Sequence, residues 1–173
     1  MMSMGNDAVA ATIEQLLADL DNIYNQYAAK NAQEASEKRP DSLFAKWFNI
    51  ASPDQAMHQA FMSDVERCTA AIAQTLAPLK QSAPAHCQEY AHRALHVLFA
   101  PKPKEEQTDF ERYLAIVEYY GAALFPYASL DELERIHREQ LERTPRRRMF
   151  PKQLETLQAL ERMISVRSTP NKS

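Results

Sequence analysis

A basic segment between two helices contains the residues best suited to bind another molecule. The segment covers residues 143–152, and its cations are Arg143, Arg146, Arg147, Arg148 and Lys152. The planar guanidinium of arginine makes paired hydrogen bonds to carboxylate and phosphate groups. Pro145 should end the helix before the segment, and Pro151, at a first helical position, should begin the next one. We therefore predict an inter-helix loop that binds an anionic partner. An equally good interpretation is a solvated loop that pairs with the acidic N-terminal helices.

Tyrosines in the same part of the chain form a second candidate binding feature. Tyr113, Tyr119 and Tyr127 lie partly outside the apolar stripe of the helices expected there. An aromatic pocket beside arginines suits a peptide or a single-stranded nucleic acid, because rings stack on bases and guanidinium groups pair with phosphates. The alternative is that these rings belong to the hydrophobic core, as we expect for most aromatic residues of this chain.

Histidines and cysteines do not indicate catalysis or metal binding. His92 and His96 are four residues apart and share a helical face, as in helical zinc sites, but Cys87 lies on the opposite face. We interpret the two histidines as exposed. Cys68 and Cys87 fall on apolar stripes, where cysteine packs as a small hydrophobe. The two glycines of the chain are too few for a phosphate-binding loop. We expect a protein that is not an enzyme, with no metal, cofactor or small-molecule substrate.

The elements that position these residues are expected to be helices. Only two of the 173 residues are glycine, which tight hairpin turns normally need, and helix-favouring residues are abundant. Hydrophobic side chains recur at helical spacing over residues 8–30, 53–80, 85–99, 109–125, 130–143 and 151–166. The predicted fold class is therefore all-α, a bundle of about six helices.

Capping patterns and polar stretches predict where these helices begin and end. Ser52, Thr108 and Ser129 each precede a helix start, and Ser129 with Glu132 fits a capping box. In such a box the Ser hydroxyl accepts from the Glu amide, and the Glu side chain returns to the Ser amide. Residues 31–41 are predicted as a loop or frayed helix end, and residues 43–48 as a short aromatic segment that fills the core.

Charge and proline content suggest how the chain is divided. Residues 1–134 have 10 Lys and Arg against 19 Asp and Glu, a net charge of −9, whereas residues 135–173 have 10 against 4, a net charge of +6. We predict an acidic N-terminal bundle (1–100), a Pro/Lys linker (101–108), a C-terminal helical region (109–167) and a disordered tail (168–173). Whether the helices form one bundle or two packed sub-bundles is open. With no signal peptide, no membrane span and two thiols expected to be reduced, we predict a cytoplasmic protein.

Two short strings resemble the C-terminal half of the primosomal replication protein N″ (PriC) family. Residues 109–114 (DFERYL) are similar to the family's D-F-E-R-R-L helix, and residues 137–139 (HRE) begin 28 residues later. The resemblance implies a non-enzymatic replication-restart factor that binds single-stranded DNA and the acidic tail of single-stranded DNA-binding protein, and helps to load the replicative helicase. The chain departs from the family in its acidic first 134 residues and in Tyr113, where the motif has its second Arg.

Two functions follow as alternatives. The first is a helical adaptor, with a possible place in DNA replication or restart, whose arginine loop binds DNA or an acidic protein tail. The second is a small regulatory or interaction protein without a nucleic-acid role, such as an immunity protein, a secretion chaperone or a mobile-element accessory factor. Because prolines confine the positive charge to one loop, the sequence favours a local contact with one acidic partner over the coating of nucleic acid.

Overall fold

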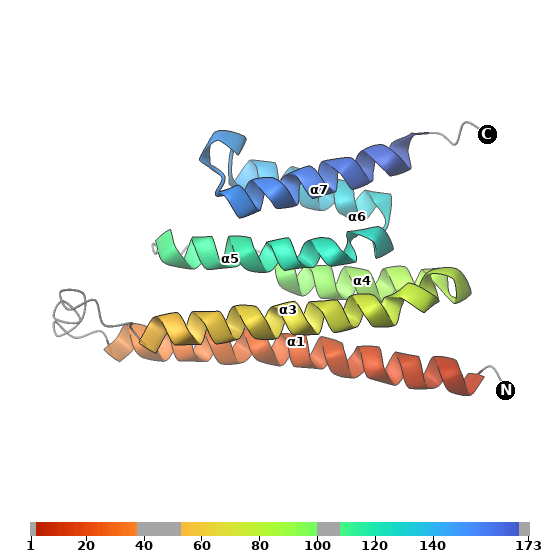
Figure 1. Cartoon of the computed structure of the whole chain (residues 1–173), viewed down its shortest axis with the longest axis horizontal. Helices are drawn as coiled ribbons and strands as arrows, with labels where there is room; N and C mark the ends of the chain where they lie inside the picture. The colour runs from red at the N-terminus through yellow and green to blue at the C-terminus, as the bar shows by residue number, and fades with distance from the viewer. Residues whose placement is uncertain (1–2, 38–52, 100–107, 170–173) are drawn as a thin grey trace.

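The computed structural model describes residues 3–37, 53–99 and 108–169, with side chains described for 7–27, 59–99 and 115–169. These ranges contain six α-helices and no strand (Figure 1): α1 (Ser3–Glu37), α3 (Pro53–Ser82), α4 (Pro84–Phe99), α5 (Thr108–Gly121), α6 (Leu130–Arg143) and α7 (Pro151–Ser168). Two short 3-10 helices, η1 (Ala122–Tyr127) and η2 (Arg146–Arg148), join α5 to α6 and α6 to α7. The all-α prediction is therefore confirmed for the described ranges.

The helices lie side by side as an elongated bundle (Figure 1). α1 packs along α3 at one edge, and α6 packs along α7 at the other. α4 and α5 lie between these pairs, where both contact α3 and α5 also contacts α7. None of the helices within the described ranges is long and apolar enough to cross a membrane.

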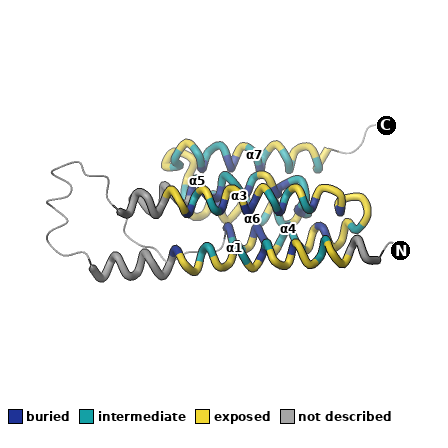
Figure 2. The backbone as a smooth tube through the Cα atoms, turned by 60° about the horizontal axis from the view of Figure 1, so that its bottom comes forward, coloured by how far each residue is buried: buried dark blue, intermediate teal, exposed yellow. Residues whose placement is uncertain are grey.

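One hydrophobic core runs through the bundle, and each helix contributes one face to it (Figure 2). Leu76 and Leu95 of α3 and α4 belong to the same cluster of buried side chains as Val117 and Leu133 of α5 and α6. Residues on both sides of the predicted linker therefore share a core. Residues 101–107 of that linker lie outside the described part of the chain, as do Ser52, the aromatic segment 43–48, and residues 170–173 of the predicted tail.

Three predicted helix limits differ from the structure by four residues or more, and the first is the start of α1, which lies at Ser3 rather than at 8. α1 continues to Glu37 through a stretch expected to be a loop or frayed end, because the Ala, Gln and Glu residues there sustain a helix. α5 ends at Gly121 rather than at 125, and the chain continues as η1. Pro126 explains the change, since it has no N–H to donate and its ring crowds the carbonyl four residues earlier. Gly121 also packs closely on α4, where a Cβ would lie 3.0 Å from Cε2 of Phe99.

The start of α6 is capped from two directions. The amide N–H of Glu132 donates to Oγ of Ser129 at 3.3 Å, which confirms half of the predicted capping box. The other half is wrong, because the Glu132 carboxylate pairs with Arg135 at 2.5 Å. The N–H of Ser129 donates instead to Nε2 of His92 on α4, at 3.1 Å. His92 is therefore half-buried rather than exposed, whereas His96 is exposed as expected.

Candidate functional site

The predicted arginine loop is a short 3-10 turn, η2, which we call the arginine turn (Arg146–Arg148). The N–H of Arg148 donates to the carbonyl of Pro145 at 2.9 Å, and the N–H of Met149 donates to that of Arg146 at 3.1 Å. α6 ends at Arg143 and α7 begins with Pro151 at its first position, as predicted. The turn is thus held at both ends by helices and within itself by backbone hydrogen bonds.

Arg143 belongs to a partly buried ion pair that joins α6 to α5. Its Nη2 donates to Oε1 of Glu118 at 2.7 Å, and Glu118 is only 3% exposed. Nε2 of Gln140, one turn earlier on α6, lies 3.4 Å from the other carboxylate oxygen. A buried carboxylate needs such partners, because an unpaired buried charge is strongly unfavourable. Arg143 therefore stabilises the packing of α6 on α5 by pairing with Glu118.

Arg146 and Lys152 are also paired within the C-terminal helices. Arg146 forms an ion pair with Glu161 of α7, and Nε2 of His137 lies 3.1 Å from the same carboxylate oxygen. Lys152 pairs with Glu155 at 3.1 Å, and its Nζ lies 4.2 Å from the centre of the Tyr119 ring. Internal pairing of the basic segment thus occurs, but the carboxylates lie on α5 and α7 rather than on the N-terminal helices.

Arg147 and Arg148 differ from their neighbours. Both side chains are exposed, and neither side chain makes a hydrogen bond or ion pair with any residue that the structure describes. Each guanidinium keeps its full set of donors for a ligand in solution. The arrangement presents two adjacent cations on a turn whose flanking cations, Arg143 and Arg146, are anchored to carboxylates.

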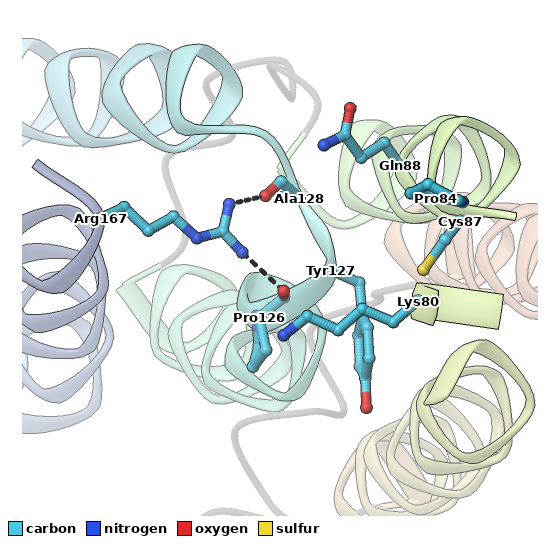
Figure 3. Close-up of a pocket in the computed structure, with 8 residues that line it drawn as sticks. All are labelled: Lys80, Pro84, Cys87, Gln88, Pro126, Tyr127, Ala128 and Arg167. Carbon is cyan, nitrogen blue, oxygen red and sulfur yellow. Dashed lines mark hydrogen bonds between the residues drawn. The ribbon is translucent and has the colours of Figure 1, made fainter. Parts of the chain in front are cut away.

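Tyr119 and Tyr127, the two predicted tyrosines whose side chains the structure describes, line different cavities. Tyr119 and Tyr120 line a groove of about 710 Å³ between α3, α5 and α7, which we call the tyrosine groove. Tyr127 lines a separate pocket of about 280 Å³ (Figure 3). The prediction of a shared pocket is therefore wrong for Tyr119 and Tyr127. The chain turns into η1 after Gly121, which lies between these two tyrosines. Tyr113 lies in α5, and its side chain is outside those described.

The two cysteines are buried and free. Burial raises the pKa of the Cys68 thiol to about 11, and its Sγ donates to the carbonyl of Leu16 at 3.2 Å. Burial also raises the pKa of the Cys87 thiol. A raised pKa keeps both sulfurs in the thiol form, which is a poor nucleophile and a poor metal ligand. Among the residues that the structure describes, no group of three or more His, Cys, Asp or Glu side chains is placed to hold a metal ion.

Comparison with protein-family models, with curated proteins and with solved structures finds no match for this chain. The two strings that resemble the PriC family both lie in helices, residues 109–114 in α5 and residues 137–139 in α6. In the second string His137 and Glu139 contact Glu161 and Arg135, whereas Arg138 is exposed. Membership of that family stays a prediction.

Proposed function

We propose that this protein is a non-enzymatic helical adaptor that binds an acidic protein segment through Arg147 and Arg148. The observation that carries the proposal is that these two adjacent guanidinium groups are exposed and have no partner among the described residues. Arginine pairs with carboxylates through two parallel hydrogen bonds, which gives such a contact both strength and direction. Because the backbone of the arginine turn is already ordered, little of its conformational freedom is lost on binding.

The distribution of free charge favours an acidic protein segment over a nucleic acid. Three of the five cations of the segment, Arg143, Arg146 and Lys152, are paired with carboxylates of the protein itself. Single-stranded nucleic acids are bound by basic grooves with aromatic rings that follow the backbone over several nucleotides. Two adjacent cations suit a shorter contact. A role in replication restart is a narrower form of this proposal and rests on the resemblance to the PriC family.

Fluorescence anisotropy with a short labelled peptide rich in Asp and Glu tests the proposal. The test variant is the double substitution Arg147→Gln and Arg148→Gln. Its matched control is Arg138→Gln with Arg162→Gln, which removes two exposed arginines without a described partner from α6 and α7. We expect the wild type to bind and the test variant to bind about tenfold more weakly, as expected for the loss of charge-assisted hydrogen bonds. The control should bind within about threefold of the wild type, because only long-range screened charge is lost.

Three results would contradict this function. The first is no binding of the peptide by the wild type at low salt. The second is equal weakening by the test and control variants, which would reduce the effect to net charge. The third is tighter binding of a single-stranded oligothymidine of the same charge, with a steep salt dependence, which would assign the arginine turn to nucleic acid.

A further inference from the structure

The pocket that contains Tyr127 brings together two basic side chains from distant parts of the chain (Figure 3). Lys80 comes from the end of α3 and Arg167 from the last turn of α7. The remaining wall comes from α4, η1 and the residue after η1, through Pro84, Cys87, Gln88, Pro126, Tyr127 and Ala128. We call this site the lysine–arginine pocket.

Backbone carbonyls hold Arg167 in place at the edge of the pocket. Its Nη1 donates to the carbonyl of Ala128, and its Nη2 donates to the carbonyls of Pro126 at 2.5 Å and Phe125 at 3.4 Å. Figure 3 shows the side chain reaching from α7 to the carbonyls of Ala128 and Pro126. The three hydrogen bonds leave two of the five N–H donors of the guanidinium for another acceptor.

The positive charge of the pocket has no counter-charge among the described residues. No described Asp or Glu lines the pocket, and neither Lys80 nor Arg167 forms an ion pair with a carboxylate that the structure describes. Burial lowers the pKa of Arg167, and no carboxylate acts against this effect. The guanidinium nevertheless stays protonated at neutral pH. A half-buried cation of this kind is stabilised by an anion that enters its pocket.

We propose that the lysine–arginine pocket binds a small molecule with one oxyanion group, a carboxylate or a phosphate monoester, between Lys80 and Arg167. The rings of Pro84, Pro126 and Tyr127 provide apolar walls, so the ligand has a compact apolar body next to its anionic group. The volume of about 280 Å³ is at the small end of ligand pockets and limits that body to about one ring. The side-chain amide of Gln88 offers a further polar contact.

Isothermal titration calorimetry with four probes tests the assignment on the full chain. Benzoate and phenyl phosphate each combine one ring with an oxyanion, benzyl alcohol is a neutral counterpart, and inorganic phosphate has no apolar body. We expect one of the two ring oxyanions to bind at least tenfold more tightly than benzyl alcohol and inorganic phosphate. Preference for benzoate would identify carboxylates as the ligand class, and preference for phenyl phosphate would identify phosphate monoesters.

Lys80→Gln is the test variant because the Lys80 side chain is exposed and makes no hydrogen bond or ion pair with a described residue; its Nζ lies 5.9 Å from the centre of the Tyr127 ring, a contact that contributes little to the fold. It should weaken binding of the preferred probe about tenfold. Arg162→Gln is the matched control, because Arg162 is an exposed arginine on the same helix as Arg167 but lines the tyrosine groove and not this pocket. It should leave the affinity within about twofold. Amide resonances of Gln88 and Tyr127 should shift on binding.

The inference is overturned if no probe binds at millimolar concentration, if benzyl alcohol binds as tightly as the acids, or if Lys80→Gln binds like the wild type. It does not depend on the arginine turn. The double variant Arg147→Gln and Arg148→Gln should therefore keep full affinity for the preferred probe even if the acidic peptide fails to bind.

Discussion

Glu118 determines the role of Arg143 at the scale of single residues. Its carboxylate is almost fully buried, with 4% of the side chain exposed, whereas 41% of the Arg143 side chain is exposed. The two ends of this ion pair are therefore unequal. Removing the arginine leaves a buried charge without its counter-ion, while removing the carboxylate leaves a guanidinium that can turn to water.

We predict that Arg143→Gln destabilises the protein more than Glu118→Gln does. The first substitution should lower the free energy of unfolding by about 3 kcal/mol, the cost of breaking a buried pair and leaving one charge behind. The second should cost about 1 to 2 kcal/mol, close to the loss of a hydrogen bond to a charged group. Urea unfolding measures both. Arg148→Gln, which loses no described contact, is the control, and an Arg143→Gln variant as stable as this control would refute the structural role of Arg143.

His137 should make the stability depend on pH. Burial and, to a smaller extent, the charge of Arg146 lower the pKa of His137 below its ordinary value of 6.5. The unfolded chain therefore takes up this proton before the folded chain does. The contribution of neutral His137 is fully present above about pH 6.5 and is lost as the pH falls from there through the lowered folded pKa.

Urea unfolding at about pH 7.5 and about pH 5.5 measures this effect. The wild type should lose more stability between the two conditions than His137→Gln does, since other titrating groups contribute to both proteins. Arg146→Gln removes the second cause of the lowered pKa and should show an intermediate loss. Equal losses in the wild type and in His137→Gln would show that the histidine does not titrate differently on folding.

Sequence reasoning located the basic segment but not the partners of its cations. Proline geometry is local, so the positions of Pro145 and Pro151 were enough to place the arginines between two helices. Glu118 and Glu161 lie 25 and 15 residues from the arginines that they bind, and such contacts depend on how helices pack. One signal was available for the first pair, because Glu118 interrupts the apolar face of α5, where an unpaired carboxylate is rarely found.

At the scale of helices, too, local features could be predicted from the sequence, whereas contacts between distant residues could not. Helical spacing and the hydroxyl of Ser129 were sufficient to locate α6, because both act within one or two turns. The partner of the Ser129 N–H, His92, lies 37 residues away on α4. His92 therefore joins two helices through a backbone group. Nε2 of His92 acts as the acceptor of this hydrogen bond, so this ring nitrogen carries no proton in the contact.

We predict that His92→Leu lowers the free energy of unfolding by about 1 to 2 kcal/mol, because a partly buried N–H at the helix start loses its acceptor. His96→Leu is the matched control, since His96 is exposed one turn later on the same helix, and its cost should stay within about 0.5 kcal/mol. Thermal and urea unfolding should both show that His92→Leu destabilises the protein more than His96→Leu does. Equal effects of the two substitutions would show that the contact with Ser129 does not stabilise the junction of α4 and α6.

At the scale of the whole molecule, the uneven charge of the chain acts partly within the fold. Arg143 and Arg146 of the basic C-terminal region neutralise carboxylates on α5 and α7 and so tie three helices together. Among the exposed arginines without a described partner, Arg147 and Arg148 are adjacent, whereas Arg138 and Arg162 stand singly on α6 and α7. Further positive charge lies in the lysine–arginine pocket. A net charge of +6 over residues 135–173 therefore overstates the basic surface that a partner would meet.

The shared core predicts that the helices unfold together. Leu20 of α1 and Leu133 of α6 are both fully buried in one cluster, although α1 and α6 lie at opposite edges of the bundle (Figure 1). Leu20→Ala and Leu133→Ala should each cost about 2 to 5 kcal/mol, the usual range for removing a buried leucine side chain. Val166→Ala, at a position 72% exposed, should cost less than about 0.5 kcal/mol.

Circular dichroism and amide hydrogen exchange during urea unfolding distinguish one bundle from two sub-bundles. If the core is a single cooperative unit, both leucine variants shift one transition, and amides of α1 and α6 lose protection at the same urea concentration. If the chain instead consists of two sub-bundles, Leu133→Ala shifts only a transition confined to α5, α6 and α7, while α1 and α3 unfold as in the wild type. We expect the first result, because α3 and α4 both contact α1 and α5, and all four helices contribute buried side chains to the same cluster as α6.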